Sequence, residues 1–435
     1  MRDFLATTAT LALAATAFVA TPAFAQDTAA PASTQQSDED ATPKRDGDIV
    51  VTARRREESI RDVPGTITAV TGDQLEAKGP VAGTGDLLTT VPGVRFNDVA
   101  SENLAEISVR GSGTQRATGA DSGVGLFVNG AYVGSSTLGG RNFKTIDFFD
   151  LERVESLEGP QGALYGRNSE FGVINIVLAK PRFQSSGYIR NGFTFGLNQN
   201  RLAVVINEPL SDTVAIRIGA EGFHQTEGFY YDPTHDKYYD QTNGFTARGQ
   251  IRYRSGPLDV TLLVDGQDLK LPSFVNSLVI PGGGVNAAVP QGFTQSRFIL
   301  PHEGEDGLQQ KTIRGMLMIS YDLGGGTVIE STTMATRWHS SQQYGAAIDL
   351  ATAIKLRQSG QIGIYPFTQV RTDVVDRTLY QDLHVKGSVA DGRLNWLAGV
   401  EGLYQNDDYS LIIGSSPCAF TLAASFCTGT PTAPV

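Results

Sequence analysis

From residue 182 onward, apolar and polar residues alternate with a period of two. One such run has apolar residues at Val214, Ile216, Ile218 and Ala220, and others cover residues 250–254 and 394–401. Successive side chains of a β-strand point to opposite faces, so this period predicts strands with one apolar and one polar face. A soluble β-sandwich and a membrane β-barrel both fit the alternation.

The connections between these runs favour the barrel. Short turns alternate with long stretches such as residues 271–310, and the short turns are Glu208–Asp212, Ser255–Pro257, Gly324–Gly326 and Ala390–Gly392. Tight turns on one side and long loops on the other are typical of transmembrane barrels. We expect about nine or ten strands over residues 185–435.

Composition narrows the classes of protein that remain. The 435 residues carry a formal net charge of −11, which argues against general nucleic-acid binding. The mean hydropathy of −0.14 excludes a bundle of membrane-spanning helices. It does not exclude a barrel, because alternating strands average to a near-neutral hydropathy.

The N-terminus has the pattern of a secretory signal peptide. A positive start at Arg2 precedes an apolar stretch from Leu5 to Ala20, and Ala23-Phe24-Ala25 provides an A-x-A cleavage site. We therefore expect residues 1–25 to be removed on export. Residues 26–47 are rich in Ala, Thr, Ser, Gln, Asp and Pro, and predict a disordered tether.

A short segment of strand-forming residues follows the tether. We call Asp48-Ile49-Val50-Val51-Thr52-Ala53 the box segment. Such a segment on a tether suits addition to the sheet edge of a partner protein, where main-chain hydrogen bonds supply the affinity. Residue type alone is equally compatible with the first strand of the next domain.

Residues 59–180 predict a compact α+β domain. Strand signals lie at 66–70, 107–110, 124–128, 154–157 and 173–177, with short helices near 74–77 and 86–91. Thr71 suits the N-cap of the first helix. Asn129-Gly130 between two apolar runs predicts a hairpin turn.

Catalytic patterns are missing from the sequence. It contains no P-loop, no H-E-x-x-H motif and no G-x-S-x-G elbow, and its five histidines are scattered. We therefore predict that the protein is not an enzyme and has no cofactor and no metal site. Cys418 and Cys427 lack zinc-ligand spacing, and one disulfide or two thiols are equally compatible with their positions.

Several motifs in order resemble the TonB-dependent outer-membrane receptor family. They follow a signal peptide and the box segment, and consist of Leu87-Leu88 with Val91-Pro92-Gly93-Val94, Ile107–Gly111, Asp150–Glu155, Gly159–Asn168 and Gly172–Val177. The chain departs from the family's usual pattern at Glu158, Phe171 and Asn129, where Arg, Gly and Asp are common.

The resemblance implies an α+β plug domain followed by an antiparallel transmembrane β-barrel. The box segment would then be a TonB box that binds a TonB-like energy-transducing protein, and the protein would lie in the outer membrane of a Gram-negative bacterium. Candidate plug–barrel contacts are Glu152, Arg153, Glu155 and Arg167, for which solvated charges in a wet lumen are an equally good interpretation.

Uptake of an extracellular ligand is the function that the resemblance implies. We expect a scarce nutrient such as a ferric siderophore to bind loops that include Tyr230, Tyr231, His235, Tyr238 and Tyr239, although aromatic residues at a membrane interface are the commoner interpretation. A truncated or non-functional receptor, a ligand-gated signalling receptor and a soluble periplasmic β-rich protein are the alternatives.

The number of strands also predicts that the barrel is incomplete. A plugged outer-membrane transporter has about 22 strands, and each spanning strand needs about 9–11 residues. The 255 residues from 181 to 435 leave fewer than about 12 for each strand and its loop. We therefore expect the chain to hold the plug and about half of the barrel strands.

Overall fold

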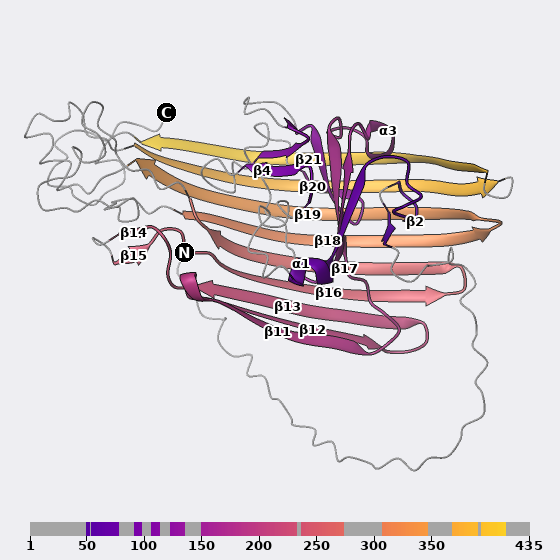
Figure 1. Ribbon diagram of the computed structural model, residues 1–435, viewed down its shortest axis with the longest axis horizontal. Helices are drawn as coiled ribbons and strands as arrows, with labels where there is room; N and C mark the ends of the chain where they lie inside the picture. Colours follow the sequence, from indigo (N-terminus) through magenta and orange to yellow (C-terminus); the bar gives the residue numbers. More distant parts are fainter. Residues whose placement is uncertain are drawn as a thin grey trace, which may run out of the picture. The chain divides into compact units, whose positions relative to one another are not determined.

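A computed structural model describes most of the chain between Ile49 and Gly414 (Figure 1). The described residues are 49–52, 54–77, 91–97, 106–113, 122–134, 149–232, 236–273, 307–346, 368–389 and 393–414. The predicted signal peptide, tether and second plug helix lie outside these ranges, apart from Val91 at the end of the helix. Asp48, Ala53, His235, Cys418 and Cys427 also lie outside them.

The plug is built around a five-stranded sheet in the order β3-β9-β10-β7-β8. The strands are β3 (Ile67–Thr71), β9 (Leu151–Glu158), β10 (Gly172–Leu178), β7 (Val124–Val128) and β8 (Ala131–Tyr132). β7 and β10 are parallel and the other neighbours are antiparallel. All five strands lie at or next to the segments that the sequence predicted as strands or as the hairpin partner.

Smaller elements surround this sheet. They are the pair β1 (Val50–Val51) and β2 (Glu58–Ser59), the three-stranded sheet of β4 (Val94–Asn97), β5 (Glu106–Val109) and β6 (Ser112–Gly113), and the helices α1 (Gly72–Ala77) and α3 (Gly162–Tyr165). Thr71 and Gln74 form a reciprocal capping box at the start of α1, because each side chain bonds the other's backbone N–H. The sequence-based prediction of a cap at Thr71 is confirmed.

The turn between β7 and β8 follows from its two residues. Asn129 has φ +48° and Gly130 has φ +78°, the left-handed pair that a type I′ hairpin requires. The Asn129 carboxamide oxygen accepts from the N–H of Leu178, and the Gly130 N–H donates to Asn175. The turn is therefore fixed to β10, which lies beside β7.

The interior of the plug is apolar. Every residue of β7 and β10 is buried, and the Phe127 ring lies between the rings of Tyr132 and Tyr165 at centroid distances of 5.6 and 4.8 Å. Strands that are buried on both faces lose the alternation of a surface strand. This is why β10 reads as the continuous apolar run Val173–Val177, interrupted only by Asn175.

The second part is an antiparallel sheet of nine strands among the described residues, in the order β11-β12-β13-β16-β17-β18-β19-β20-β21. They are β11 (Ser186–Thr194), β12 (Gln199–Pro209), β13 (Val214–Gln225), β16 (Asn243–Ser255), β17 (Leu258–Leu271), β18 (Gly307–Gly324), β19 (Thr327–Ala346), β20 (Thr368–Val389) and β21 (Leu394–Gly414). Sequential strands are neighbours, and β11 is not paired with β21, so the sheet is an open part of a barrel. The short 3-10 helix η2 (Phe195–Leu197) follows β11, and the pair β14 (Tyr231–Asp232) and β15 (Lys237–Tyr238) lies between β13 and β16.

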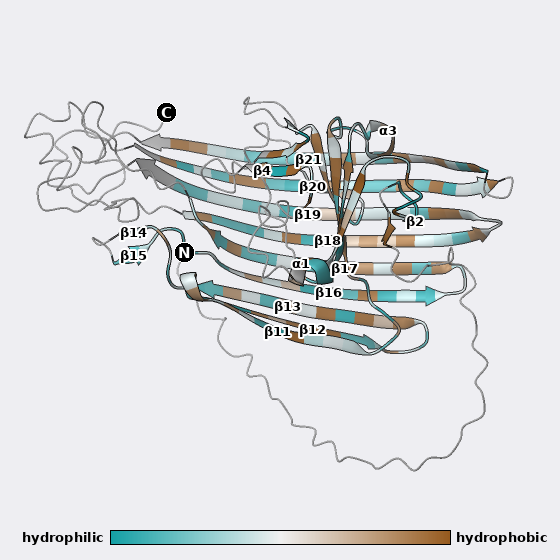
Figure 2. Cartoon of the chain, in the orientation of Figure 1, coloured by the Kyte–Doolittle hydropathy of each residue, from teal (hydrophilic) through white to brown (hydrophobic). Residues whose placement is uncertain are grey.

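Hydrophilic and hydrophobic residues alternate along the strands of this sheet (Figure 2), and its two faces differ in polarity. Toward the plug it buries charged and polar side chains, among them Arg217, Arg248, Gln250, Asp265, Arg314, Asp376, Asp382 and His384. On the other face large apolar side chains are exposed, among them Leu202, Ile206, Ile218, Ile251, Leu262, Ile313, Leu379, Leu383 and Val400. A soluble sandwich buries its apolar face, so this arrangement fits a barrel whose outside meets lipid. Within the described residues no helix is both long and apolar enough to cross a membrane.

Candidate functional site

The box segment is held against the plug. Val50 and Val51 pair with Ser59 and Glu58, and the side chain of Val51 is buried in the plug core. The N–H of Ile60 also donates to the carbonyl of Ile49. In this conformation the segment is the first strand of its own domain, which is one of the two alternatives that the sequence left open.

A buried carboxylate fixes the end of this strand. Glu155 of β9 is fully buried, and its Oε1 accepts from the Thr52 N–H at 2.7 Å and from the Arg153 Nε at 2.7 Å. Asn175 of β10 donates to its other oxygen at 3.3 Å. A buried carboxylate needs such partners because burial removes its hydration. The box segment therefore supplies part of the solvation of a charge in the plug.

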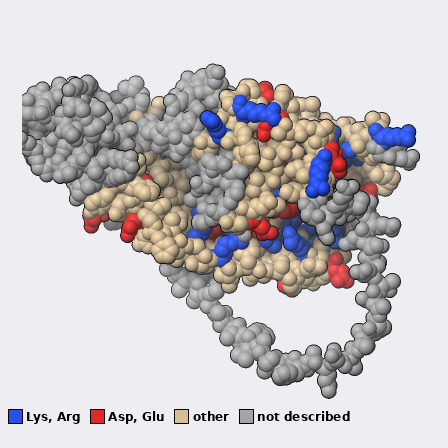
Figure 3. Space-filling view, viewed as in Figure 1, with Lys and Arg blue, Asp and Glu red and all other residues tan. Residues whose placement is uncertain are grey.

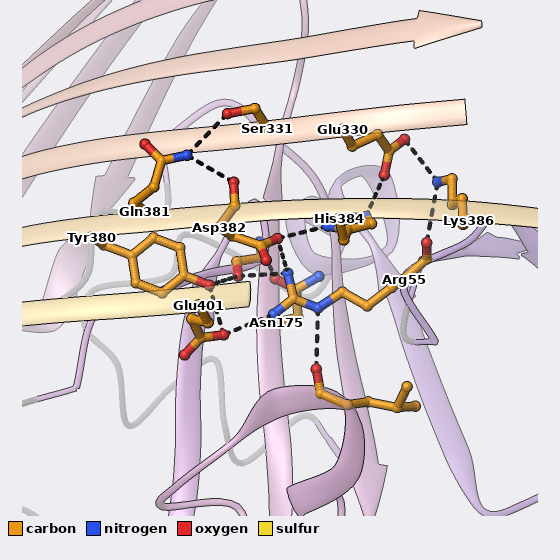
Figure 4. A network of polar contacts seen from close by, with 12 residues as sticks. Arg55, Asn175, Glu330, Ser331, Tyr380, Gln381, Asp382, His384, Lys386 and Glu401 are labelled. Carbon is orange, nitrogen blue, oxygen red and sulfur yellow. Dashed lines mark hydrogen bonds and ion pairs between the residues drawn. The ribbon is translucent and has the colours of Figure 1, made fainter. Parts of the chain in front are cut away.

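Arg55, two residues beyond the box segment, joins the plug to the barrel sheet (Figure 4). Its Nη1 lies 3.0 Å from Asp382 on β20 and its Nη2 lies 3.4 Å from Glu401 on β21. The same guanidinium donates to the carbonyl oxygens of Leu164 and Gly130 in the plug. Tyr380 of β20 lies beside it, with its hydroxyl 3.0 Å from Glu401 and 3.3 Å from the Gly130 carbonyl oxygen.

Further polar groups of the sheet extend this contact. His384 lies between Asp382 and Glu330, at 2.9 and 2.8 Å, and Lys386 bonds Glu330 at 2.7 Å. Lys386 also donates to the carbonyl oxygen of Arg55. We call Arg55, Glu330, Tyr380, Asp382, His384, Lys386 and Glu401 the Arg55 network (Figure 4).

Burial and neighbouring groups shift the pKa values of Tyr165 and Arg55. Burial raises the pKa of Tyr165, whose ring lies under the Arg55 guanidinium at 5.0 Å. Desolvation by itself lowers the pKa of Arg55, but the neighbouring Tyr380 and Asp382 outweigh it, so that the pKa is raised. Arg55 therefore stays charged and Tyr165 stays neutral at any physiological pH.

A second anchor uses a strand near the other edge of the nine-stranded sheet. Asp150, which precedes β9, accepts two hydrogen bonds from Arg217 of β13, at 2.7 and 2.5 Å, and both residues are buried. Arg248 of β16 donates to the carbonyl oxygen of Phe149 at 2.7 Å, and Gln250 donates to that of Ala179. Inward-facing side chains of the sheet thus bond the main chain at both ends of the β9–β10 hairpin.

A polar cavity of about 500 Å³ lies between the plug and the sheet. Its lining includes Thr52 of the box segment, Glu152 and Arg153 of β9, and Arg252 and Lys386 of the sheet. Basic and acidic side chains lie close together on the face of the molecule that Figure 3 shows. Thr52 at the end of the box segment therefore borders a polar cavity.

Three of the four predicted plug–barrel residues bond within the plug. Arg153 forms ion pairs with Glu152 and Glu155, and Glu155 binds Thr52 and Asn175. Arg167 is exposed beside α3 and makes no ion pair with another described residue. In this conformation, ion pairs between plug and sheet among the described residues come from Asp150 and Arg55 instead.

Sequence reasoning missed these two anchors for different reasons. Asp150 is the first residue of the motif Asp150–Glu155, and no separate signal in the sequence marks it as a contact with the barrel. Arg55 sits in the run Arg54-Arg55-Arg56, which looks like a solvated charge cluster. A usable signal is the set of inward-facing charges on the predicted strands, since Arg217 and Asp382 alternate with apolar residues and need partners in the lumen.

The predicted ligand loop forms a small hairpin. The rings of Tyr231 and Tyr238 are 5.1 Å apart across β14 and β15, and the Tyr231 hydroxyl donates to Asp236. Tyr239 is buried, whereas Tyr230 is partly exposed. The ligand role of these residues stays a prediction. Among the described residues no group of three or more His, Cys, Asp or Glu side chains is arranged to hold a metal ion.

These features define a plugged-barrel fold: an α+β plug bonded to the inner face of an antiparallel sheet whose outer face is apolar. The comparisons with known proteins agree. Residues 59–173 match the family described as TonB-dependent Receptor Plug Domain. A vitamin B12 transporter BtuB of Photobacterium profundum is 32% identical over 144 residues, which are 33% of this chain and 22% of the transporter.

One further relative and one solved structure extend the likeness beyond the plug. A ferrioxamine B receptor of Salmonella typhimurium is 24% identical over 247 residues, which are 56% of this chain and 31% of the receptor. The crystal structure of the ferric yersiniabactin uptake receptor FyuA of Yersinia pestis matches with a TM-score of 0.64 at 17% identity, over 81% of this chain and 50% of that one. Residues 59–173 thus match the plug domain of TonB-dependent receptors, and the chain spans half or less of the length of these similar proteins.

Proposed function

We propose that the protein is an outer-membrane receptor that binds a scarce nutrient on its long-loop side and imports it without chemical change. A TonB-like protein would supply the energy by pairing with the box segment and pulling on it. Relatives named for vitamin B12, ferrioxamine B and ferric yersiniabactin support a ligand of that kind, a cobalamin or a ferric siderophore.

One observation carries this proposal: the box segment is bonded to the plug just before the residue that bonds the plug to the barrel. Thr52 binds Glu155 inside the plug, and Arg55 binds Asp382 and Glu401 on the sheet. Removing the box segment would leave Glu155 with fewer partners and would draw Arg55 away from two carboxylates. A pull on this segment is thereby coupled to both the plug interior and the plug–barrel contact.

The geometry also suits strand addition by a partner. β1 makes only two residue pairs with β2, so the competing intramolecular strand is short. A partner that offers a longer edge would gain more main-chain hydrogen bonds than the segment loses. Thr52 of the box segment lines the polar cavity and Val51 packs in the plug core, so release of the segment would uncover the Val51 side chain.

The first test measures binding of a TonB-like periplasmic domain from the same bacterium to the protein in detergent. Val50→Pro removes a backbone N–H and should abolish binding, because proline cannot donate to a strand ladder. Val50→Thr keeps both the N–H and β-branching, and should bind as the unchanged protein does. Equal binding by all three would overturn the proposed partner.

The second test follows uptake of vitamin B12, ferrioxamine B and ferric yersiniabactin by cells that carry the protein. We expect one of them to be bound by both variants but accumulated only with Val50→Thr. Accumulation that is unaffected by Val50→Pro would contradict energised import. Failure to bind any of the three probes would reject these nutrient classes while leaving the partner test unaffected.

Two alternative functions that the sequence allowed, a soluble periplasmic protein and a non-functional receptor, make different predictions. A soluble periplasmic protein does not fit the outward-facing apolar side chains, because a contiguous exposed apolar face favours aggregation in water. A non-functional receptor would not bind the TonB-like domain. Binding in the first test would therefore argue against this alternative, and no binding would favour it.

A further inference from the structure

A shallow hollow lies on the outward face of the barrel sheet, away from the plug. Its floor is formed by Gly315 of β18 and Ala335 of β19, which are directly opposite each other in the register. Ile313, Leu379 and Tyr404 also line it, and all three are at least half exposed. The hollow has a volume of about 480 Å³. Small residues among large ones thus leave room on this face for an apolar chain.

Two arginines form one rim of the hollow. Arg337 of β19 is directly opposite both Ile313 of β18 and Arg377 of β20. Like charges that face each other across neighbouring strands are destabilising unless an anion lies between or beside them. Asp408 of β21 bonds Arg377 at 2.7 Å, whereas Arg337 has no carboxylate partner among the described residues. The rim therefore has an excess of positive charge.

The depth of these residues in a membrane follows from their distance to the short turns. Arg337 lies ten residues from Thr327, where β19 begins, and Arg377 lies twelve residues from Val389, where β20 ends. A tilted strand crosses the hydrocarbon in about 9–11 residues. The two guanidinium groups are then at the boundary on the long-loop side, and the floor of the hollow is just inside the hydrocarbon.

We propose that this hollow binds an anionic, phosphate-bearing lipid from the leaflet on the long-loop side. One acyl chain would lie over Gly315 and Ala335, and the phosphate would bond Arg337 and Arg377. Guanidinium groups bind phosphate with two parallel hydrogen bonds, which a net-neutral headgroup offers less strongly. This inference rests on the proposed placement of the sheet in the outer membrane.

A lipid fits this surface better than a soluble anion or a protein partner. A soluble anion would use the arginines but leave the apolar floor empty, and a hollow of about 480 Å³ has the size of a small-molecule site rather than of a protein interface. The positive rim at the membrane boundary matches the anionic headgroup of a lipid, and the apolar surface just inside it matches an acyl chain of the same molecule.

The experiment counts lipids bound to the purified protein by native mass spectrometry. The protein in mild detergent receives equal amounts of phosphatidylglycerol and phosphatidylcholine. We expect the unchanged protein to prefer phosphatidylglycerol about tenfold, which is the scale of one charge-assisted contact. Arg337→Gln should reduce this preference to near equality. Gly315→Leu should weaken the binding of both lipids, because the added side chain fills the hollow.

Arg371→Gln is the matched control. Arg371 is exposed on the same face of β20 but is paired with Asp373 and lies outside the hollow, so its loss should leave the preference unchanged. An unchanged preference in Arg337→Gln, or an equal loss in Arg371→Gln, would overturn the proposed site. Alkaline extraction of cell membranes is run in parallel: release of the protein would contradict the membrane placement itself, whereas retention confines any failure to the lipid site.

Discussion

The plug and the barrel sheet use similar strand-forming residues in opposite ways. β10 buries all seven of its residues in the plug, among them Val173, Ile174 and Ile176. β13 of the sheet buries Arg217 and leaves Ile218 more than half exposed. The strand propensity of a segment therefore says little about which face is inside. The medium that meets the outer face decides which face is apolar, because lipid accommodates apolar side chains as the core of a soluble protein does.

The largest expected effect comes from placing a charge in the plug interior. Ile176→Asp should destabilise the plug by more than about 4 kcal/mol, because the site is fully buried and offers no partner for the carboxylate. Urea unfolding or protease resistance of the plug would measure this. Ile206→Asp on the exposed face of β12 is the control for the added charge, and an equal loss of plug stability in both would contradict the comparison.

The next effect concerns the ion pair that joins the two regions. Asp150→Ala should cost about 3–5 kcal/mol, because it leaves the buried Arg217 guanidinium without its carboxylate. Asp150 has φ +57°, a conformation that Asn also tolerates, so Asp150→Asn separates the charge from the backbone preference. Asp150→Asn should be milder than Asp150→Ala, because asparagine tolerates this φ and its carboxamide oxygen can still accept from Arg217, but it should still lose stability with the charge. An Asp150→Asn variant as stable as the unchanged protein would show that backbone geometry, rather than the ion pair, dominates this position.

An apolar-to-charged change on the outer face tests the sheet's side of the comparison. Ile218→Arg should cost about 2–4 kcal/mol in a bilayer if the residue lies near the midplane. In water the same exposed position would tolerate arginine, with an effect within about 0.5 kcal/mol. Reversible folding into lipid vesicles measures the difference. A neutral result in lipid would remove the main physical argument for the outward apolar face.

The smallest expected effect is on the retention of the box segment. Glu155→Gln keeps the shape of the side chain but removes the charge that Thr52 and Arg153 share, which should weaken the segment's hold by about 1–3 kcal/mol. Faster hydrogen exchange of the Val51 and Thr52 amides would report it. Unchanged exchange, with faster exchange elsewhere in β9, would mean that Glu155 supports the plug sheet alone.

The sequence predicted the strands, turns and helix cap of the protein better than the contacts between distant residues. Local signals were sufficient for the β7–β8 turn at Asn129-Gly130 and for the capping box at Thr71, because both depend on neighbours in the chain. The contact of Arg55 with Asp382 spans 327 positions, and no local pattern indicates it. Alternation predicted the strands but not which face is buried, since period two is the same in a sandwich and a barrel.

The small pair of β1 and β2 has a mechanical consequence. Val50 is opposite Ser59, so the two ends of this hairpin, Ile49 and Ile60, lie side by side. A load applied to the chain before Ile49 would therefore separate the strands like a zipper. Each hydrogen bond would bear the load in turn, first at Ile49, then along β1, then at Thr52 and finally at Arg55. Breaking the hydrogen bonds one after another needs far less force than breaking them all at once. The Asp150–Arg217 ion pair would carry load only after the chain that leads to Asp150 has been extended.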